Sequence, residues 1–163
     1  MRIPGPRTEV KAGGDQACRL EKARKMPLTL RDLEHLTLHD VIGRHDLGQV
    51  RLPTPDEITA LSGTVDVGRD RGTLRDWRLV AIDLLDRPLE IVLLGSRGDQ
   101  TWGTSPVRVL DLDAGWAYTR SGSIYTLVEA GQGEPPLEYV LHMCALLRHW
   151  GWGTALEIPE VWY

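Results

Sequence analysis

The spacing of apolar positions changes along the chain and predicts where helices and strands lie. Residues 29–36 place leucines at helical spacing behind a threonine, which predicts a short helix. A second short helix is predicted from Thr54, because Thr-Pro-Asp-Glu supplies a capping hydroxyl, a proline at the first helical position and a glutamate at the third. Gly63 is expected to end this helix.

From residue 64 onward, most of the pattern is typical of strands. Two long apolar segments, 77–85 and 89–94, are separated by Asp-Arg-Pro, which predicts two strands joined by a tight turn. Further short strands are expected at 50–52, 64–67, 107–112, 116–119 and 124–128, with turns at 70–73, 113–115 and 121–123 and a polar loop over 95–105. The short connections favour antiparallel pairing, since a parallel crossover needs about a dozen residues.

Residues 137–150 carry the clearest helical pattern of the chain. One apolar stripe runs along this segment, formed by Leu137, Val140, Leu141, Cys144 and Leu147. Gly151 is expected to end the helix. The predicted fold class is therefore α+β: an antiparallel β-meander of about five or six strands, preceded by short helices, with the long C-terminal helix packed on one sheet face.

Composition fits a globular protein that folds without a metal or a disulfide framework. The chain has 163 residues, of which 42% are hydrophobic, and only two cysteines. Cys144 is expected to be a small core residue. No apolar run approaches the roughly 18–20 residues of a membrane span or forms the apolar centre of a secretory signal, so a cytoplasmic location without membrane contact is expected.

The net charge of −4 is divided unevenly along the chain. Residues 1–25 hold seven cationic side chains and three acids, whereas residues 26–163 hold 12 arginines, no lysine and 20 acids. The first segment has few large apolar side chains, so the sequence predicts a flexible basic extension over 1–25 and a single α+β domain over 26–163. The extension is interpreted as a basic arm, as a stretch preceding a start at Met26, or as a plain solvated tail.

A group of histidines and acids is the first candidate for chemistry. His35 and His39 stand four residues apart, which places both on one face of a helix, and His45 and Asp46 follow. Histidines with a carboxylate are typical of transition-metal sites. The metalloprotease pattern, however, requires glutamate after the first histidine, and Leu36 stands there. The sequence therefore favours no metal and no cofactor.

The predicted C-terminal helix carries a second polar group. Glu138, His142 and His149 are spaced by four and seven residues and share one helix face. A histidine beside a carboxylate can act as a general base, but no nucleophile motif accompanies this pair. The pattern is most typical of a solvated helix face.

Aromatic side chains gather at the C-terminal end of the chain. Exposed aromatics are typical anchors of partner binding. The predicted partner-binding residues are therefore Trp150, Trp152, Trp162 and Tyr163, together with Glu138, His142 and His149.

These observations predict a small non-catalytic regulatory protein that binds another protein, of accessory, inhibitor or immunity type and of bacterial or mobile-element origin. A homo-oligomer is compatible with them. One alternative is a metal-dependent hydrolase that uses His35, His39 and His45. The other is nucleic-acid binding through the basic extension or the cluster Arg69, Arg71, Arg75 and Arg78. The excess of acids disfavours it, because phosphate contacts require clustered cations.

Overall fold

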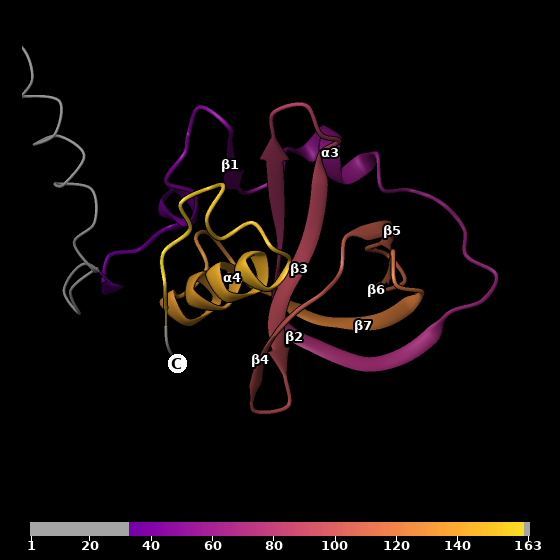
Figure 1. Cartoon of the computed structure of the whole chain (residues 1–163). Coiled ribbons are helices and arrows are strands. Elements are labelled where there is room, and N and C mark those ends of the chain that lie inside the picture. Colours follow the sequence, from indigo (N-terminus) through magenta and orange to yellow (C-terminus); the bar gives the residue numbers. More distant parts are fainter. Residues whose placement is uncertain (1–32, 162–163) are drawn as a thin grey trace, which may run out of the picture.

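The computed structural model describes residues 33–161 of the chain (Figure 1). The predicted extension over 1–25 and the cap of the helix predicted over 29–36 lie outside the described residues, as do Trp162 and Tyr163. Within the described part, strands make up most of the regular structure, and the fold is of the α+β class. No helix in this part is long and apolar enough to cross a membrane.

Ten regular elements follow one another along the described residues. They are η1 (Leu38–Val41), β1 (Gly48–Arg51), α3 (Pro55–Thr59), β2 (Arg69–Leu84), β3 (Glu90–Arg97), β4 (Gln100–Gly103), β5 (Val107–Asp111), β6 (Trp116–Thr119), β7 (Ser123–Ala130) and α4 (Leu137–His149). The turns predicted at 86–88, 113–115 and 121–123 each connect two strands. The helix predicted from Thr54 is present as α3, but it ends at Thr59, before Gly63.

The strands form one mixed sheet rather than an antiparallel meander of five or six strands. Seven strands take part in the order β4-β3-β2-β7-β6-β5, and β1 pairs with β2 outside this path. All pairs are antiparallel except β2 and β7, which are parallel. Strands β3 to β6 lie between β2 and β7 in the chain and serve as the crossover between these two parallel strands. The short connections between consecutive strands therefore did not predict the parallel pair.

β2 differs most from the prediction. It spans 16 residues, and its first part, where a turn was expected at 70–73, pairs with β7. Gly72 has a φ of +92°, a left-handed conformation that glycine adopts without strain, and it lies at a register shift of the strand. The glycine thus marks a bulge instead of a turn. Residues 64–67, predicted as a strand, precede β2 without regular structure.

The polar segment 95–105, predicted as a loop, is largely a hairpin. β3 continues to Arg97, and β4 returns over Gln100–Gly103 with Trp102 opposite Gly95. The tight turn between them falls at 98–99. Polar residues fill these strands because they lie near the end of the sheet, where less of the surface is buried.

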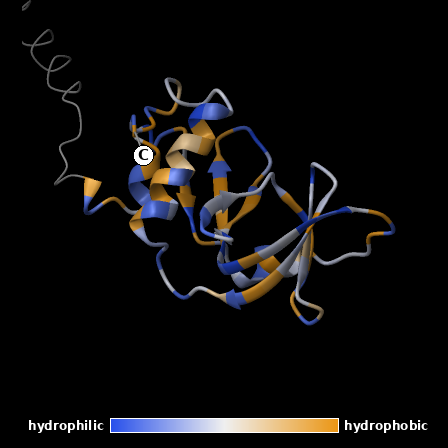
Figure 2. Ribbon diagram, turned by 90° about the horizontal axis from the view of Figure 1, so that it is seen from below, coloured by the Kyte–Doolittle hydropathy of each residue, from blue (hydrophilic) through white to orange (hydrophobic). Residues whose placement is uncertain are grey.

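The second part of β2, over 79–84, and most of β3 are buried on both faces, which explains the continuous apolar sequence there. Alternate residues point into two separate clusters. One cluster lies under α4 and takes Val80, Ile82, Leu84, Val92 and Leu94 from the two strands. The other lies toward β5, β6 and β7 and takes Leu79, Ala81, Ile91 and Leu93. Figures 1 and 2 show α4 on one side of this two-stranded ribbon and β5–β7 on the other.

The helix predicted over 137–150 is present as α4, but its buried face is rotated from the predicted stripe. Tyr139, Val140, Met143, Cys144 and Leu147 are buried. Leu137 and Leu141, which were expected in the stripe, are only partly buried. Burial raises the pKa of the free Cys144 thiol to about 12, which agrees with a core residue and not with a reactive thiolate.

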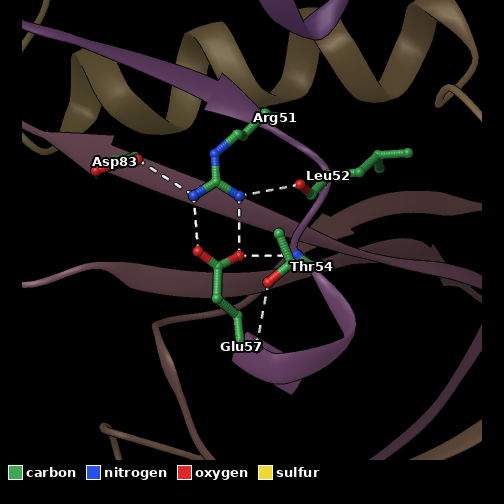
Figure 3. Close-up of polar contacts among 5 residues, drawn as sticks. All are labelled: Arg51, Leu52, Thr54, Glu57 and Asp83. Atoms are coloured by element: carbon green, nitrogen blue, oxygen red, sulfur yellow. Dashed lines mark hydrogen bonds and ion pairs between the residues drawn. The ribbon is translucent and has the colours of Figure 1, made fainter. Parts of the chain in front are cut away.

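An arginine joins β1, α3 and β2 in one polar network (Figure 3). Arg51 donates two hydrogen bonds to the Glu57 carboxylate at 2.8 and 2.7 Å and a third to Asp83 at 3.2 Å. Glu57 also completes the capping box of α3, because its carboxylate accepts from the Thr54 backbone N–H and the Thr54 hydroxyl accepts from the Glu57 backbone N–H. The short helix is thereby fixed to the sheet.

We expect the Glu57→Gln variant to lose about 1–2 kcal/mol of the free energy of unfolding at neutral pH, since it removes charge-assisted hydrogen bonds. The bonds from Arg51 and then from Thr54 lower the pKa of Glu57 from 4.5 to about 2. A lowered carboxyl pKa stabilises the fold above its unfolded value, and the contribution is lost as the pH falls toward the folded value. In urea unfolding, the difference between wild type and variant should therefore shrink between about pH 4.5 and pH 2.

The matched control is Asp66→Asn, at an exposed acid that forms no ion pair within residues 33–161. This variant should change the free energy of unfolding by less than about 0.5 kcal/mol, both at neutral pH and near pH 2. A wild-type advantage over Glu57→Gln that stays constant down to pH 2 would contradict the network.

Candidate functional site

The four candidate metal ligands do not converge. The rings of His39 and His45 stack with centroids 4.4 Å apart, whereas His35 is exposed on the preceding segment. Asp46 is held by Arg44, which donates two hydrogen bonds of 2.8 and 2.7 Å and lowers the pKa of the carboxyl to about 2. Among the described residues, no group of three or more histidines, cysteines or acids is placed to hold a metal ion.

The four arginines of the predicted basic cluster have different environments along β2. Arg75 faces Glu129 at 3.5 Å, and both side chains are mostly exposed. Arg78 is only 11% exposed and pairs with Asp76 at 3.0 Å. Arg69 and Arg71 form no ion pair within the part of the chain that the structure describes. These arginines are therefore interspersed with acids and do not form a continuous basic patch.

Arg78 belongs to a buried contact between β2 and α4. Its guanidinium donates to the carboxylate of Asp76 and to the backbone carbonyl of Gln132, and it lies 5.7 Å from the ring centre of Tyr139. Burial, together with the nearby carboxylate of Asp76, raises the pKa of Tyr139 to about 12. Asp76 has a φ of 45° at the bulge where β2 changes register with β3. The arrangement anchors the first turn of α4 to the sheet.

The polar residues of α4 are not equally accessible. Glu138 and His149 are exposed, near opposite ends of the helix. His142 is half-buried against Gly103 of β4, so close that a Cβ atom at position 103 would lie 3.2 Å from the imidazole ring. This burial lowers the pKa of His142. The helix face predicted to be solvated is thus partly covered by the sheet.

Trp150 and Trp152 are positioned by the way α4 ends. Gly151 has a φ of 88°, and its N–H donates to Arg148 while the N–H of Trp152 donates to Leu147. These two bonds form a Schellman motif, in which glycine takes the left-handed position after the helix. The motif brings residue 152 back over Leu147, and both residues line the same pocket.

This pocket, called the Trp pocket below, lies between the end of α4 and the β2–β3 hairpin. Its volume is about 60 Å³. It is lined by Ile82, Leu84, Arg87, Pro88, Glu90, Leu147, Trp150 and Trp152. Two leucines that are close in sequence to the lining residues Arg87 and Pro88 are exposed, Leu85 with 62% and Leu89 with 37% of its surface accessible. The hairpin that supplies Arg87 and Pro88 to the pocket therefore also carries accessible apolar side chains.

Two charged side chains, Arg87 and Glu90, line the Trp pocket. The Arg87 guanidinium lies over the Trp152 ring, 4.2 Å from its centre. Glu90 is already engaged in an ion pair with Arg120 from the β6–β7 turn. Arg87 forms no ion pair with any of residues 33–161.

Of the predicted partner-binding residues, Trp150 and Trp152 thus come together in the pocket, and Glu138, His142 and His149 lie elsewhere on α4. The hairpin residues Leu85, Arg87 and Leu89 were not predicted as part of a site. The sequence of this segment predicts a hairpin and nothing more. The position of the hairpin beside the tryptophans depends on how α4 packs on the sheet.

The chain matches no protein-family model, and neither the curated proteins nor the solved structures contain a match to it.

Proposed function

We propose that this protein is a non-catalytic regulatory protein that binds another protein through the Trp pocket and the adjoining hairpin leucines. The observation that carries the proposal is the meeting of Trp150, Trp152 and Arg87 in one surface hollow. Tryptophan and arginine are the residue types most enriched among binding hot spots, and such residues act from desolvated pockets.

The surroundings of Cys144 do not suit a thiol nucleophile, which favours binding over thiol-based catalysis. Cys144 is buried in the cluster beneath α4, and its raised pKa keeps it protonated at neutral pH. The exposed leucines support the same conclusion, because the accessible Leu85, in the hairpin that lines the pocket with Arg87 and Pro88, offers apolar area that a partner can cover.

Site-specific photo-crosslinking in the native host tests this proposal. A photoreactive residue replaces Leu85, which is 62% exposed in the β2–β3 hairpin two residues before Arg87, or Leu112, which is 52% exposed in the β5–β6 turn, as a matched control. We expect one defined protein to be captured from position 85 and not from position 112. Equal capture from both positions, or no capture from position 85, would contradict the proposal.

The partner identified in this way is then purified and its affinity measured by calorimetry. The Trp152→Ala variant should weaken binding about 30-fold or more, which corresponds to a hot-spot residue. The Leu112→Ala variant should leave the affinity within about twofold of wild type, as is usual outside an interface core. Circular dichroism verifies that each variant is folded.

A further inference from the structure

We infer that the Trp pocket recognises an acidic side chain of its protein partner, whose carboxylate binds Arg87 while a neighbouring apolar side chain enters the pocket. This inference rests on the proposed function, and it specifies the chemistry of the partner at that same site.

Arg87 contacts Trp152, and its side chain donates no hydrogen bond to any of residues 33–161. Its guanidinium lies over the ring of Trp152 at 4.2 Å, and the side chain makes no ion pair with residues 33–161. Contact through the face of a guanidinium leaves the N–H groups along its edge free to donate. That edge matches a carboxylate, which accepts two parallel hydrogen bonds from arginine.

The acids nearest to Arg87 along the chain leave this edge available. Glu90, which lines the pocket, is ion-paired with Arg120. Asp86 precedes Arg87 with a φ of 59°, and no ion pair joins the two side chains. The acidic balance of residues 26–163 acts over a longer range, and salt screens it within about 8 Å at physiological ionic strength. Local charge at the pocket is therefore set mainly by Arg87.

The pocket itself selects for an apolar group beside that carboxylate. Leu84, Leu147 and Trp150 form part of its wall. Its volume of about 60 Å³ is far below that of a pocket for a drug-sized ligand and suits a small apolar side chain. The partner segment we expect thus carries an aspartate or glutamate next to a leucine or valine.

Three blocked peptides that differ at one position test this recognition. Each contains Leu-X-Leu between Gly-Ser flanks, with X as aspartate, asparagine or lysine, and binding to the full chain is followed by the NMR shifts of the tryptophan indole N–H groups. We expect the aspartate peptide to bind about tenfold more tightly than the asparagine peptide, the advantage typical of a charge-assisted pair. The lysine peptide should bind most weakly.

Arginine variants separate recognition by Arg87 from general attraction. In Arg87→Met the preference for aspartate over asparagine should fall below about twofold, and Arg87→Lys should retain part of it, because lysine keeps the charge without the bidentate edge. The matched control is Arg108→Met, at an exposed arginine of β5 that forms no ion pair within residues 33–161. It should preserve the preference.

The outcomes distinguish this inference from the proposed function. Equal binding of the aspartate and asparagine peptides, a preference for lysine, or no binding at all would overturn carboxylate recognition, while a partner crosslinked from position 85 would still support the proposed function. A preference that survives in Arg87→Met would also overturn the inference. Selective aspartate binding without any partner crosslinked from position 85 would instead leave the recognition and overturn the proposed function.

Discussion

The Tyr139→Ala variant is expected to lose about 3–5 kcal/mol of the free energy of unfolding, the cost usual for removing a buried aromatic ring. Tyr139 is only 2% exposed and packs in the cluster between α4 and the β2–β3 ribbon. Its removal also leaves the Arg78 guanidinium, which lies 5.7 Å from the ring centre, beside an empty space. Urea unfolding followed by circular dichroism measures the loss.

Two control variants show whether the loss of stability comes from the buried ring of Tyr139. Tyr139→Phe keeps the ring and should lose only about 0.5–1.5 kcal/mol, because it removes the hydroxyl alone. Glu138→Ala, at the exposed neighbour on α4, should stay within about 0.5 kcal/mol of wild type. If Tyr139→Ala were no more costly than Glu138→Ala, the anchoring of α4 to β2 described above would be wrong.

Local interactions explain which parts of the fold were predictable. The capping box of α3 depends on Thr54 and Glu57, which are three residues apart. The end of α4 depends on the N–H groups of residues 151 and 152, which donate to the carbonyls of residues 148 and 147. The turn at 86–88 connects β2 and β3 as expected. Each of these features depends on a few neighbouring residues, so the sequence pattern contains the necessary information.

Pairing between distant residues explains what was missed. The parallel register places Arg75 of β2 opposite Val128 of β7, and nothing in either segment specifies that partner. A glycine with positive φ, such as Gly72, is typical of both turns and bulges. Only the pairing of β2 with β7 shows that Gly72 lies in a bulge. The irregular, polar start of β2 was therefore mistaken for a turn.

The candidate site shows the same division. Trp150 and Trp152 stood out in the sequence because aromatic residues are concentrated there. Arg87 lies more than 60 positions earlier and reaches Trp152 only because α4 packs on the ribbon that ends in the β2–β3 hairpin. Composition thus identified one side of the pocket, and tertiary packing supplied the other.

The phase of α4 was the most consequential error, because two apolar stripes overlap on this helix. Val140, Cys144 and Leu147 belong to both the predicted and the observed stripe. Leu141 belongs only to the predicted one, whereas Met143 belongs only to the observed one. The hydrophobicity of leucine favoured a buried position for Leu141. In the structure, α4 is rotated so that Tyr139 is buried in the core, and Leu141 therefore lies at the edge of the buried face.

The Leu147→Ala variant should therefore lose about 2–5 kcal/mol of the free energy of unfolding, since Leu147 is 1% exposed and its removal leaves a cavity. Leu141→Ala is the matched control, with the same chemical change on the same helix at a partly buried position, and its loss should be clearly smaller. Urea unfolding of the two variants measures the difference directly. Equal losses would place Leu141 in the core as well and would restore the predicted stripe. A harmless Leu147→Ala would contradict both the buried face of α4 and the wall of the Trp pocket that Leu147 forms.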